Sequence, residues 1–260
     1  MSSTLSPAPK MPAGHRLLRL ESCDSTNSEA RRRADAGEPG PLWVWSLRQS
    51  AGRGRNGRSW QSRPGNLFAS LLVSLRCPLA TAGQLALLAG VAAYDAVAGF
   101  LPYEARSDLL LKWPNDLLFG EEKIAGVLLE SAAASPLGGC KVVIGTGINL
   151  ASHPEDLSPP ATSLSALGTT AAPAAALEAL AACTQAWIAR WEEGTSFAAI
   201  RHAWLHRAGP TGRPIRVRVG EEQETEGTFA GLDAGGALRL VTKDGAERRI
   251  AAGDVFFMRS

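Results

Sequence analysis

The chain has 260 residues, of which 45% are hydrophobic and 20% are charged. A chain of this size can bury a core, and we expect one large domain with a small second one. The 27 basic and 25 acidic residues leave a formal net charge of +2. This balance excludes a protein that coats nucleic acid, so any basic patch must be local.

The four cysteines, Cys23, Cys77, Cys140 and Cys183, are far apart and form neither a CxxC motif nor a Cys/His cluster. They indicate neither a zinc site nor a disulfide framework, and reduced thiols fit a cytoplasmic protein. Residues 1–14 contain prolines where a signal peptide needs an apolar run, and we expect a disordered leader there. No other segment stays apolar for a bilayer crossing without Gly, Pro or charge, so we expect no membrane association.

After a first strand at residues 17–20, a helix is predicted to begin at Ser25 or Thr26. Thr26 and Glu29 have the spacing of a capping box. Capping alone would explain the polar run Ser25-Thr26-Asn27. A helix N-terminus also presents amides and short hydroxyls to a polar ligand, and the two uses are compatible.

The segment from Gln49 to Trp60, QSAGRGRNGRSW, joins two predicted core strands at residues 42–49 and 66–76. Its glycines permit positive φ and close approach to a ligand, and its arginines offer forked donors to a carboxylate or phosphate. A solvated linker or a non-specific nucleic-acid patch would look similar. A mere linker has no reason to be held at both ends inside a sheet. The glycines and arginines are Gly52, Gly54, Gly57, Arg53, Arg55 and Arg58.

A second informative stretch contains KWPND. A strand at 109–112 enters Trp113-Pro114, where proline removes a donor, so Asn115 and Asp116 should lie in a turn. A hairpin follows, with strands at 117–119 and 123–130. One by one, such residues are usually turn and surface positions. Yet Lys112 and Lys123 are two of only five lysines in the chain, and they bracket this turn, so we prefer a functional interpretation.

The remaining pattern defines the architecture. A strand at 140–149 opens into Gly-Thr-Gly, where the backbone could approach a nucleotide, and 153–168 is expected to be a mobile surface loop. From Gly212 onward, four or five short strands with glycine turns predict a small SH3-like β-barrel. Further helices are predicted at 84–101, 171–193 and 196–208. The expected fold is α+β, a mixed β-sheet flanked by helices over 15–209 and a C-terminal barrel domain over 210–260.

Together these motifs resemble those of the biotin protein ligases. The matching motifs, in order, are Ser25-Thr26-Asn27, GRGRNGRSW, KWPND followed by Lys123-Ile124-Ala125-Gly126, and GTGIN. The likeness extends from about Leu17 to Arg259. It implies the fold shared by these ligases and class II aminoacyl-tRNA synthetases. It also implies an ATP-dependent enzyme that forms biotinyl-5′-AMP and transfers biotin to a lysine of the biotin carboxyl carrier protein of acetyl-CoA carboxylase.

The resemblance implies three groups of site residues. The catalytic group is Lys112, Asp116, Lys123 and Arg53. The biotin-binding group is Ser25, Thr26, Asn27, Gln49, Gly52, Arg53, Gly54, Arg55, Lys123 and Gly126. The group on the ATP side is Arg55, Arg58, Trp60, Lys112, Asn115 and Asn149. The substrates are biotin and ATP, and Mg²⁺ should arrive with the polyphosphate without dedicated protein ligands.

Chemistry agrees with these residue types. A carboxylate that attacks the α-phosphorus of ATP brings two anions together, so the site needs fixed cations such as Arg53, Arg55, Lys112 and Lys123. Hydroxyls and amides suit the donors and acceptor of the ureido ring of biotin. Asp116 would hold the incoming lysine amine or take its proton. In the family, the glycine and arginine loop is disordered until biotin arrives and then closes over it.

Two alternative functions remain open, a lipoate or octanoate enzyme and a non-catalytic binding module. DNA binding and oligomeric state are two further points. Some bacterial ligases carry an N-terminal winged-helix domain, but about sixteen residues precede the first strand here, so we expect no DNA binding. A lipoate or octanoate ligase or transferase has the same fold, although the GRGRNGR loop resembles the biotin branch. A non-catalytic anion- or RNA-binding module is disfavoured because no stacking aromatics alternate with the arginines. A homodimer is possible, since some relatives dimerise and others are monomers.

Overall fold

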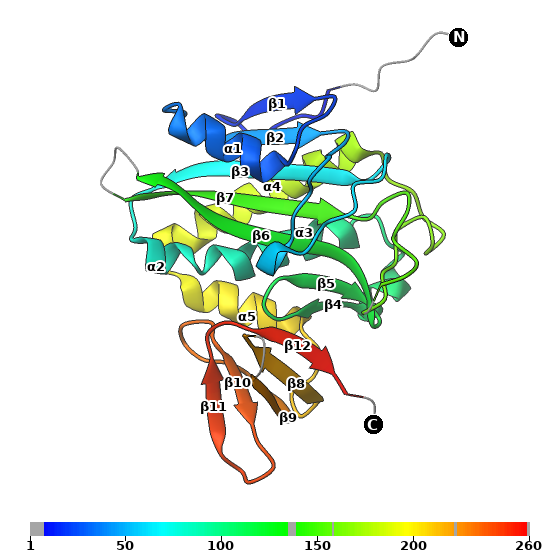
Figure 1. Ribbon diagram of the computed structural model, residues 1–260, viewed down its shortest axis with the longest axis vertical. Coiled ribbons are helices and arrows are strands. Elements are labelled where there is room, and N and C mark those ends of the chain that lie inside the picture. The colour runs from blue at the N-terminus through cyan, green and yellow to red at the C-terminus, as the bar shows by residue number, and fades with distance from the viewer. Residues whose placement is uncertain (1–7, 135–138, 158, 221–222, 259–260) are drawn as a thin grey trace.

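The structure is a computed structural model that describes residues 8–134, 139–157, 159–220 and 223–258. Within these ranges the chain forms a larger sheet with helices on both faces and a smaller sheet at one end (Figure 1). The expected α+β class, a mixed sheet flanked by helices with a separate C-terminal β-sheet, is confirmed.

The larger sheet has a mixed arrangement. Its strands are β1 (Arg16–Leu20), β2 (Leu42–Ser46), β3 (Leu67–Leu75), β4 (Leu109–Lys112), β5 (Asp116–Phe119), β6 (Glu122–Ala134) and β7 (Cys140–Ile148). Their spatial order is β1-β2-β3-β7-β6-β5-β4. Among the strands described, β1 and β2 pair in parallel and the remaining neighbours are antiparallel.

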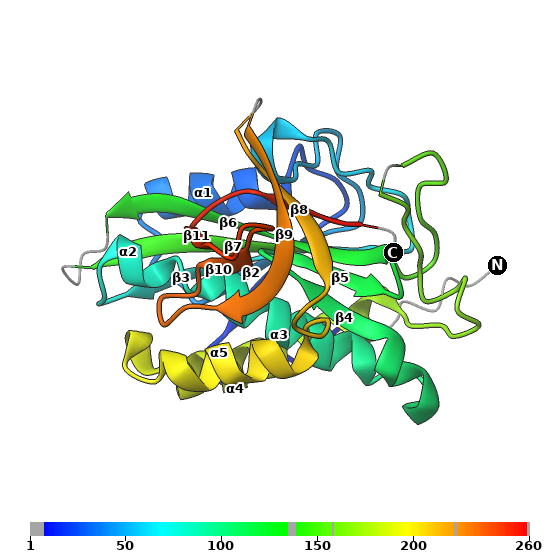
Figure 2. The same ribbon diagram turned by 90° about the horizontal axis from the view of Figure 1, so that it is seen from below.

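Helices bury both faces of this sheet (Figures 1 and 2). The helices are α1 (Thr26–Asp35), α2 (Leu79–Ala82), α3 (Leu85–Ala98), α4 (Pro173–Trp191) and α5 (Phe197–Arg207), with 3₁₀ turns η1 (Arg55–Gly57), η2 (Tyr103–Asp108) and η3 (Glu192–Gly194). On one face, α1 packs Ala30 and Ala34 with Val44 of β2. On the other, α3 and α4 join a core cluster that contains Trp43 and Trp45. Both sides of β2 are therefore buried, which explains its continuous apolar run.

One stretch of the described residues, Leu79–Ala98, is long and apolar enough by composition to cross a membrane. It comprises α2 and α3, and 61% of its apolar window is buried inside the protein. Leu85, Leu88 and Val91 on this stretch belong to the main core cluster. Core packing thus accounts for its hydrophobicity.

The smaller sheet is antiparallel and packs against the end of the larger one. Its strands are β8 (Pro214–Val219), β9 (Gln223–Leu232), β10 (Leu238–Val241), β11 (Glu247–Ile250) and β12 (Asp254–Phe257), in the order β11-β10-β9-β8-β12. Ile215, Val217 and Phe229 join the main core cluster. The indole N–H of Trp113 donates to the carbonyl of Gly236 at 3.2 Å. This shared core holds β12 close to the turn between β4 and β5.

Two local predictions, one at α1 and one at β5, are wrong. The capping box is not formed, because no side chain caps α1 and Glu29 instead pairs with Arg32 and Arg33. The Thr26 hydroxyl bonds Gln49, a contact across the fold that competes with local capping. Asp116 is the first residue of β5 rather than a turn residue, and it pairs with Lys112 of β4.

Two segments expected to be loose are partly anchored. In the predicted surface loop, Ala161 bridges to Lys123 of β6, and Thr162, Ser163 and Leu164 are buried. This part of 153–168 is therefore packed against the sheet, contrary to expectation. In the predicted leader, Met11 packs against the core and the backbone N–H of Lys10 donates to Glu178 at 3.1 Å. Residues 1–7 lie outside the described ranges.

Candidate active site

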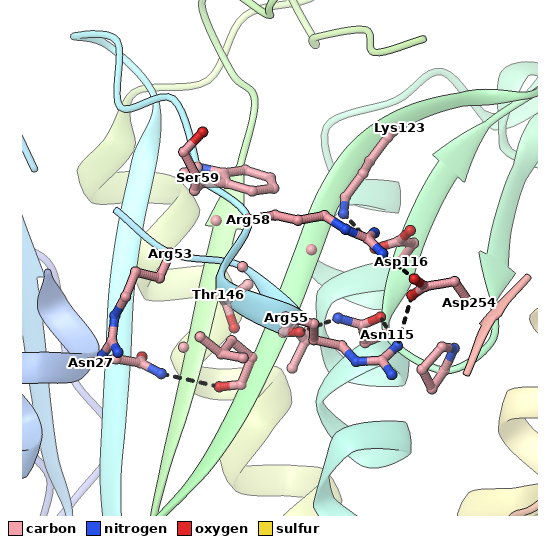
Figure 3. A pocket seen from close by; sticks show the side chains of 18 of the residues that line it. Asn27, Arg53, Arg55, Arg58, Ser59, Asn115, Asp116, Lys123, Thr146 and Asp254 are labelled. Carbon is pink, nitrogen blue, oxygen red and sulfur yellow. Dashed lines mark hydrogen bonds and ion pairs between the residues drawn. The ribbon is translucent and has the colours of Figure 1, made fainter. Parts of the chain in front are cut away.

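A cavity of about 490 Å³ lies between the larger sheet, the glycine and arginine loop, and β12 (Figure 3). This volume lies within the usual range for small-molecule sites. Besides this loop, three parts of the chain converge on the cavity: the start of α1, the strands β4 to β7 with their turns, and the C-terminal strand. The cavity therefore joins the two sheets.

At one end is a polar cradle, which we define as Thr26, Asn27, Gln49 and Ser70; Gln49 is half-buried and the other three are buried. The backbone N–H and the hydroxyl of Thr26 donate to Oε1 of Gln49 at 2.8 and 3.2 Å. The Ser70 hydroxyl lies 2.8 Å from Thr26 Oγ1 and 2.6 Å from Asn27 Oδ1. Asn27 Nδ2 donates to the Glu130 carboxylate at 2.7 Å. Each orientation is thus set by a neighbour from another element.

Glycines form the floor beside this cradle because no side chain would fit. A Cβ at Gly145 would overlap the carboxamide of Asn27, and one at Gly147 would lie 2.5 Å from the Trp60 ring. Such separations are never tolerated without movement of the neighbours. The buried indole N–H of Trp60 has no hydrogen-bond partner within the described ranges. An unsatisfied buried donor costs about 1–3 kcal/mol, which a ligand acceptor or a movement of the loop could recover.

An ion-pair triad, Lys112, Asp116 and Lys123, forms the opposite wall; Lys112 is buried, and the other two are partly buried. Asp116 lies 3.4 Å from Lys112 Nζ and 2.5 Å from Lys123 Nζ. Hairpin pairing places Lys112 directly opposite Asp116, and Asp116 pairs with Gly126 of β6 on its other side. The sheet register therefore brings together charges that are 11 positions apart in the sequence.

Burial affects the protonation of this triad. Burial lowers the pKa of Lys112 below that of an ordinary lysine, and the charge of Asp116 partly opposes this. For Asp116, burial raises the pKa, but the charges and hydrogen bonds of Lys123 and Lys112 outweigh it, and the net pKa is lowered. Asp116 is consequently ionised at neutral pH and is a poor proton acceptor.

The glycine and arginine loop is folded as a small hairpin over the cavity. Arg53 and Ser59 form an antiparallel bridge, and the backbone N–H of Trp60 donates to Gly52 at 2.8 Å. Of its three glycines only Gly57 has positive φ, at 71°, and Asn56 is also left-handed at 54°. Gly52 is required for packing instead, because a Cβ there would lie 2.7 Å from the Trp60 carbonyl oxygen. The expected conformational use of glycine thus holds at one position.

The arginines of the loop point in two directions (Figure 3). Arg53 turns toward the cradle, where it donates to Ser28 at 3.0 Å and lies 3.5 Å from Glu130. Arg55 and Arg58 turn toward Asp254 of β12. Arg55 also donates to Asn115 Oδ1 at 3.4 Å. Arg53 thus lies at the cradle end, away from the lysines with which the sequence analysis grouped it.

Most residues singled out from the sequence line the cavity. The lining includes Ser25, Thr26, Asn27, Gln49, Arg53, Gly54, Arg55, Arg58, Trp60, Lys112, Asn115, Asp116, Lys123 and Gly126. Gly52 and Asn149 do not line it. Asn149 is buried, and its amide donates to the carbonyl of Thr162 at 3.0 Å, which ties the anchored loop to the sheet.

Sequence reasoning missed several residues of the site. Thr146, the central residue of the Gly-Thr-Gly pattern, lines the cavity, although only the backbone of this pattern was expected to approach a ligand. Ser70 belongs to a stretch recognised only as a strand, and it supports the cradle through Thr26 and Asn27. Glu130 and Asp254 carried no local signal, since each contacts the site through side chains that are distant in sequence. Apolar lining from β12, Val255 and Phe256, was likewise unexpected.

The charge of the cavity favours anions. Its described lining contains five basic side chains, from Arg53, Arg55, Arg58, Lys112 and Lys123, and two acidic ones, from Asp116 and Asp254. Both carboxylates are already paired with cations. No group of three or more possible metal ligands occurs within the part of the chain that the structure describes.

Comparisons with known proteins agree with this geometry. Residues 21–149 match the Biotin/lipoate A/B protein ligase family, and residues 211–258 match the Biotin protein ligase C terminal domain. A biotin--[acetyl-CoA-carboxylase] ligase from Paracoccus denitrificans is 39% identical over 92% of this chain and 99% of its own length. One from Mycobacterium tuberculosis is 32% identical over 90% of this chain and 86% of its own length.

Solved structures give the same result. The biotin protein ligase from Aquifex aeolicus in complex with biotin and ATP superposes with a TM-score of 0.77 at 26% identity, over 94% of this chain and 99% of that one. The likeness thus extends over nearly the whole of both chains. The chain belongs to the biotin protein ligase family.

Proposed function

We propose that this chain joins biotin to one lysine of the biotin carboxyl carrier protein of acetyl-CoA carboxylase, using ATP. In the first step a biotin carboxylate oxygen bonds to the α-phosphorus of ATP and pyrophosphate leaves. In the second, the lysine nitrogen attacks the carbonyl carbon of the resulting biotinyl-5′-AMP. The amide forms, AMP leaves with the electrons of the carbon–oxygen bond, and the amine loses a proton to solvent.

One observation carries this proposal: a single cavity connects a neutral polar cradle to a strongly basic end. Thr26, Asn27 and Gln49 line the cavity and offer donors and acceptors of the kind that a ureido ring can match. Lys112 and Lys123 lie at the other end beside Arg55 and Arg58. A ligand that is polar and uncharged at its ring but anionic at its chain, such as biotin, fits this polarity.

At the basic end the two lysines have a positioning role. Lys112 and Lys123 are held by Asp116 on neighbouring strands, so their ammonium groups are fixed before substrate arrives. Fixed cations can stabilise the negative charge that develops when the carboxylate attacks phosphorus. Their compact charges suit the biotin carboxylate and the α-phosphate, which must lie in line.

Asp116 keeps its charge because its pKa is lowered. A good general base has a pKa near the working pH, so Asp116 does not fit the role of proton acceptor. It holds the lysines, and it can also hold the incoming carrier lysine as an ammonium partner. Of the two roles, holding the incoming amine or taking its proton, the lowered pKa and the ion pairs of Asp116 favour holding.

Magnesium would reach the site as part of the substrate. The carboxylates of the cavity are taken up by lysine and arginine, and Mg²⁺ binds readily to phosphate oxygens while it keeps its waters. Mg²⁺-ATP is therefore the form that this site would receive. Arg55 and Arg58 supply the remaining positive charge.

We also propose that the chain does not act on DNA. The relative from Paracoccus denitrificans, matched over 99% of its own length, is named as a ligase alone. The basic residues of the site converge on one cavity, whereas a stripe of basic residues along the surface would suit phosphate backbones. A gel-shift assay that detected specific operator binding in the presence of biotin and ATP would contradict this.

A lipoate ligase is the nearest alternative, because the matched family includes lipoate enzymes. The cradle argues against it, because the polar groups of Thr26, Asn27 and Gln49 line this end of the cavity, where a dithiolane ring would gain no hydrogen bonds. The match of residues 211–258 to a biotin ligase domain supports the same choice.

The experiment is pyrophosphate release by the protein with Mg²⁺-ATP and either biotin or lipoate, without an acceptor. We expect release that depends on biotin, followed by retention of the adenylate on the protein. Release with lipoate alone would reassign the substrate. Release with neither, from a folded sample, would favour an anion-binding module instead.

A further inference from the structure

Two arginines of the loop are held from the C-terminal sheet. Asp254 is the first residue of β12, and its carboxylate contacts Arg58 and lies 3.7 Å from Nη1 of Arg55. Arg55 Nη1 also donates to the carbonyl of Gly253 at 3.1 Å. Figure 3 shows both guanidinium groups directed at Asp254, on the side of the cavity opposite Asn27. The last strand therefore reaches a loop nearly 200 residues earlier in the chain.

The position of Asp254 is set by the smaller sheet. Antiparallel pairing with β8 places Asp254 opposite Arg218 and Val255 opposite Val217. Val255 is buried in the main core cluster. A Cβ at Gly253 would lie 2.8 Å from the Arg218 carbonyl oxygen, so the backbone before Asp254 is also closely packed. The carboxylate thus projects from a well-supported strand.

The loop has no comparable support of its own. None of the residues of η1 (Arg55–Gly57) is buried, and Arg58 and Ser59 are exposed. A segment without buried apolar contacts opens easily unless its polar contacts hold it. The ion pairs with Asp254 provide such contacts at the tip. Arg53 provides a second hold at the other end, through Ser28 and Glu130.

We propose that Asp254 is a positioning residue that holds Arg55 and Arg58 over the cavity, so that the C-terminal sheet controls how long the acyl adenylate is retained. The part of this proposal that concerns the adenylate rests on the proposed ligase function. Exposed ion pairs contribute little, but the Asp254 side chain is only 15% exposed and serves two arginines at once. With its loop held down, the cavity shields a reactive anhydride from water and from other amines.

A purely electrostatic role would give a different result. If Asp254 only reduced the positive potential of the cavity, its neutralisation would strengthen ATP binding and leave retention of the adenylate unchanged. If it positions the arginines, the loop would open more often and the adenylate would escape faster. The two roles therefore predict opposite pairs of outcomes for one variant.

The first test is limited trypsin digestion of the full chain without substrates, with the cut sites identified by peptide mass. We expect Asp254→Asn to be cut after the loop arginines about tenfold faster than the parent, since cleavage tracks the open population. Asp254→Glu keeps the charge and should restore most of the protection. Equal cleavage of the parent and Asp254→Asn would overturn the proposal. This readout needs neither biotin nor ATP, so it stands apart from the proposed function.

The second test is the rate at which biotinyl-5′-AMP leaves the protein. We expect about tenfold faster loss from Asp254→Asn, equivalent to about 1.4 kcal/mol, with no fall in the KM for ATP. Combining Asp254→Asn with Arg58→Gln should add little, because both remove the same hold. A lower KM for ATP with unchanged loss of adenylate would overturn the positioning role.

A matched control comes from the same sheet. Glu247 of β11 pairs with Arg239 of β10 at 2.7 Å on the surface, and it does not line the cavity. Glu247→Gln removes one carboxylate and one ion pair, and Asp254→Asn removes one carboxylate and two ion pairs. We expect parental cleavage and adenylate loss from it, and faster loop cleavage in this variant would overturn the assignment to Asp254.

Discussion

The two ends of the cavity are built in different ways. Three of the four cradle residues, Thr26, Asn27 and Ser70, are buried, and they are held by neighbours on α1, β3 and β6. The arginine end is more open, and it depends on ion pairs between the loop and β12. The first end is set by close packing, in which small changes of volume are felt, and the second by charges, which tolerate changes of volume. Substitutions at the two ends should therefore differ in kind.

The largest effect is expected at the lysines of the basic end. Lys112→Gln removes a fixed cation from the ion-pair triad, and we expect pyrophosphate release in the presence of biotin to fall by about a thousandfold. Lys141 is a matched control, since its side chain is also buried but bonds the carbonyl of Ala34 away from the cavity. Lys141→Gln should reduce the thermal midpoint and leave the rate per folded molecule unchanged. A comparable loss of rate in both variants would contradict a specific role for Lys112.

A substitution that adds one methyl group separates the two ends more directly. Gly145→Ala would press into the carboxamide of Asn27, and overpacking of this kind typically costs about 1–3 kcal/mol. We expect biotin affinity, measured by calorimetry, to fall by about tenfold to a hundredfold.

The control is Gly54→Ala in the loop. A Cβ there would lie 3.6 Å from the Arg58 carbonyl oxygen, an ordinary contact, and the backbone φ of −107° suits alanine. We expect nearly parental affinity. If Gly54→Ala were as damaging as Gly145→Ala, packing would not distinguish the ends of the cavity.

At the arginine end, substitutions should increase escape of the adenylate more than they weaken biotin binding. Arg55→Gly removes the contacts to Asn115, Gly253 and Asp254, and we expect about tenfold more biotin labelling of an added bystander protein. The control is Arg63→Gly, which introduces the same flexibility just beyond the loop. Arg63 donates to the carbonyl of His153. A fully selective Arg55→Gly enzyme would argue against a shielding loop.

The smallest effect concerns pH. Because burial lowers the pKa of Lys112, its charge is lost at a lower pH than that of a free lysine, whose value is 10.5. The first step needs that charge, so its rate should fall as pH rises through the lowered pKa. Within the accessible alkaline range we expect a change of about threefold.

Lys112→Arg tests this assignment, since arginine keeps its charge throughout the range. Its rate can be lower at every pH, but the alkaline limb should flatten. The same limb in both proteins would assign the titration to another group. Pyrophosphate release between neutral pH and the onset of unfolding is the measurement.

Local patterns predicted much of the architecture. The apolar run at β2 and the proline after β4 indicated a buried strand and a hairpin, and both are present. The switch to short strands after residue 212 indicated the smaller sheet. These features depend on periodicity and on backbone chemistry, which act over a few residues. The capping box failed because a distant partner, Gln49, took the Thr26 hydroxyl.

The sequence by itself determined which residue types would meet an anionic ligand: the loop arginines, the paired lysines and the polar start of α1. The tertiary structure decided which of these residues lie at each end of the cavity. It turned Arg53 toward Glu130 and turned Arg55 and Arg58 toward Asp254, and it made Gly145 and Gly147 a floor under Asn27 and Trp60. Ion pairs and close packing join residues that are far apart in the chain, and no local pattern records which partner a charge will find.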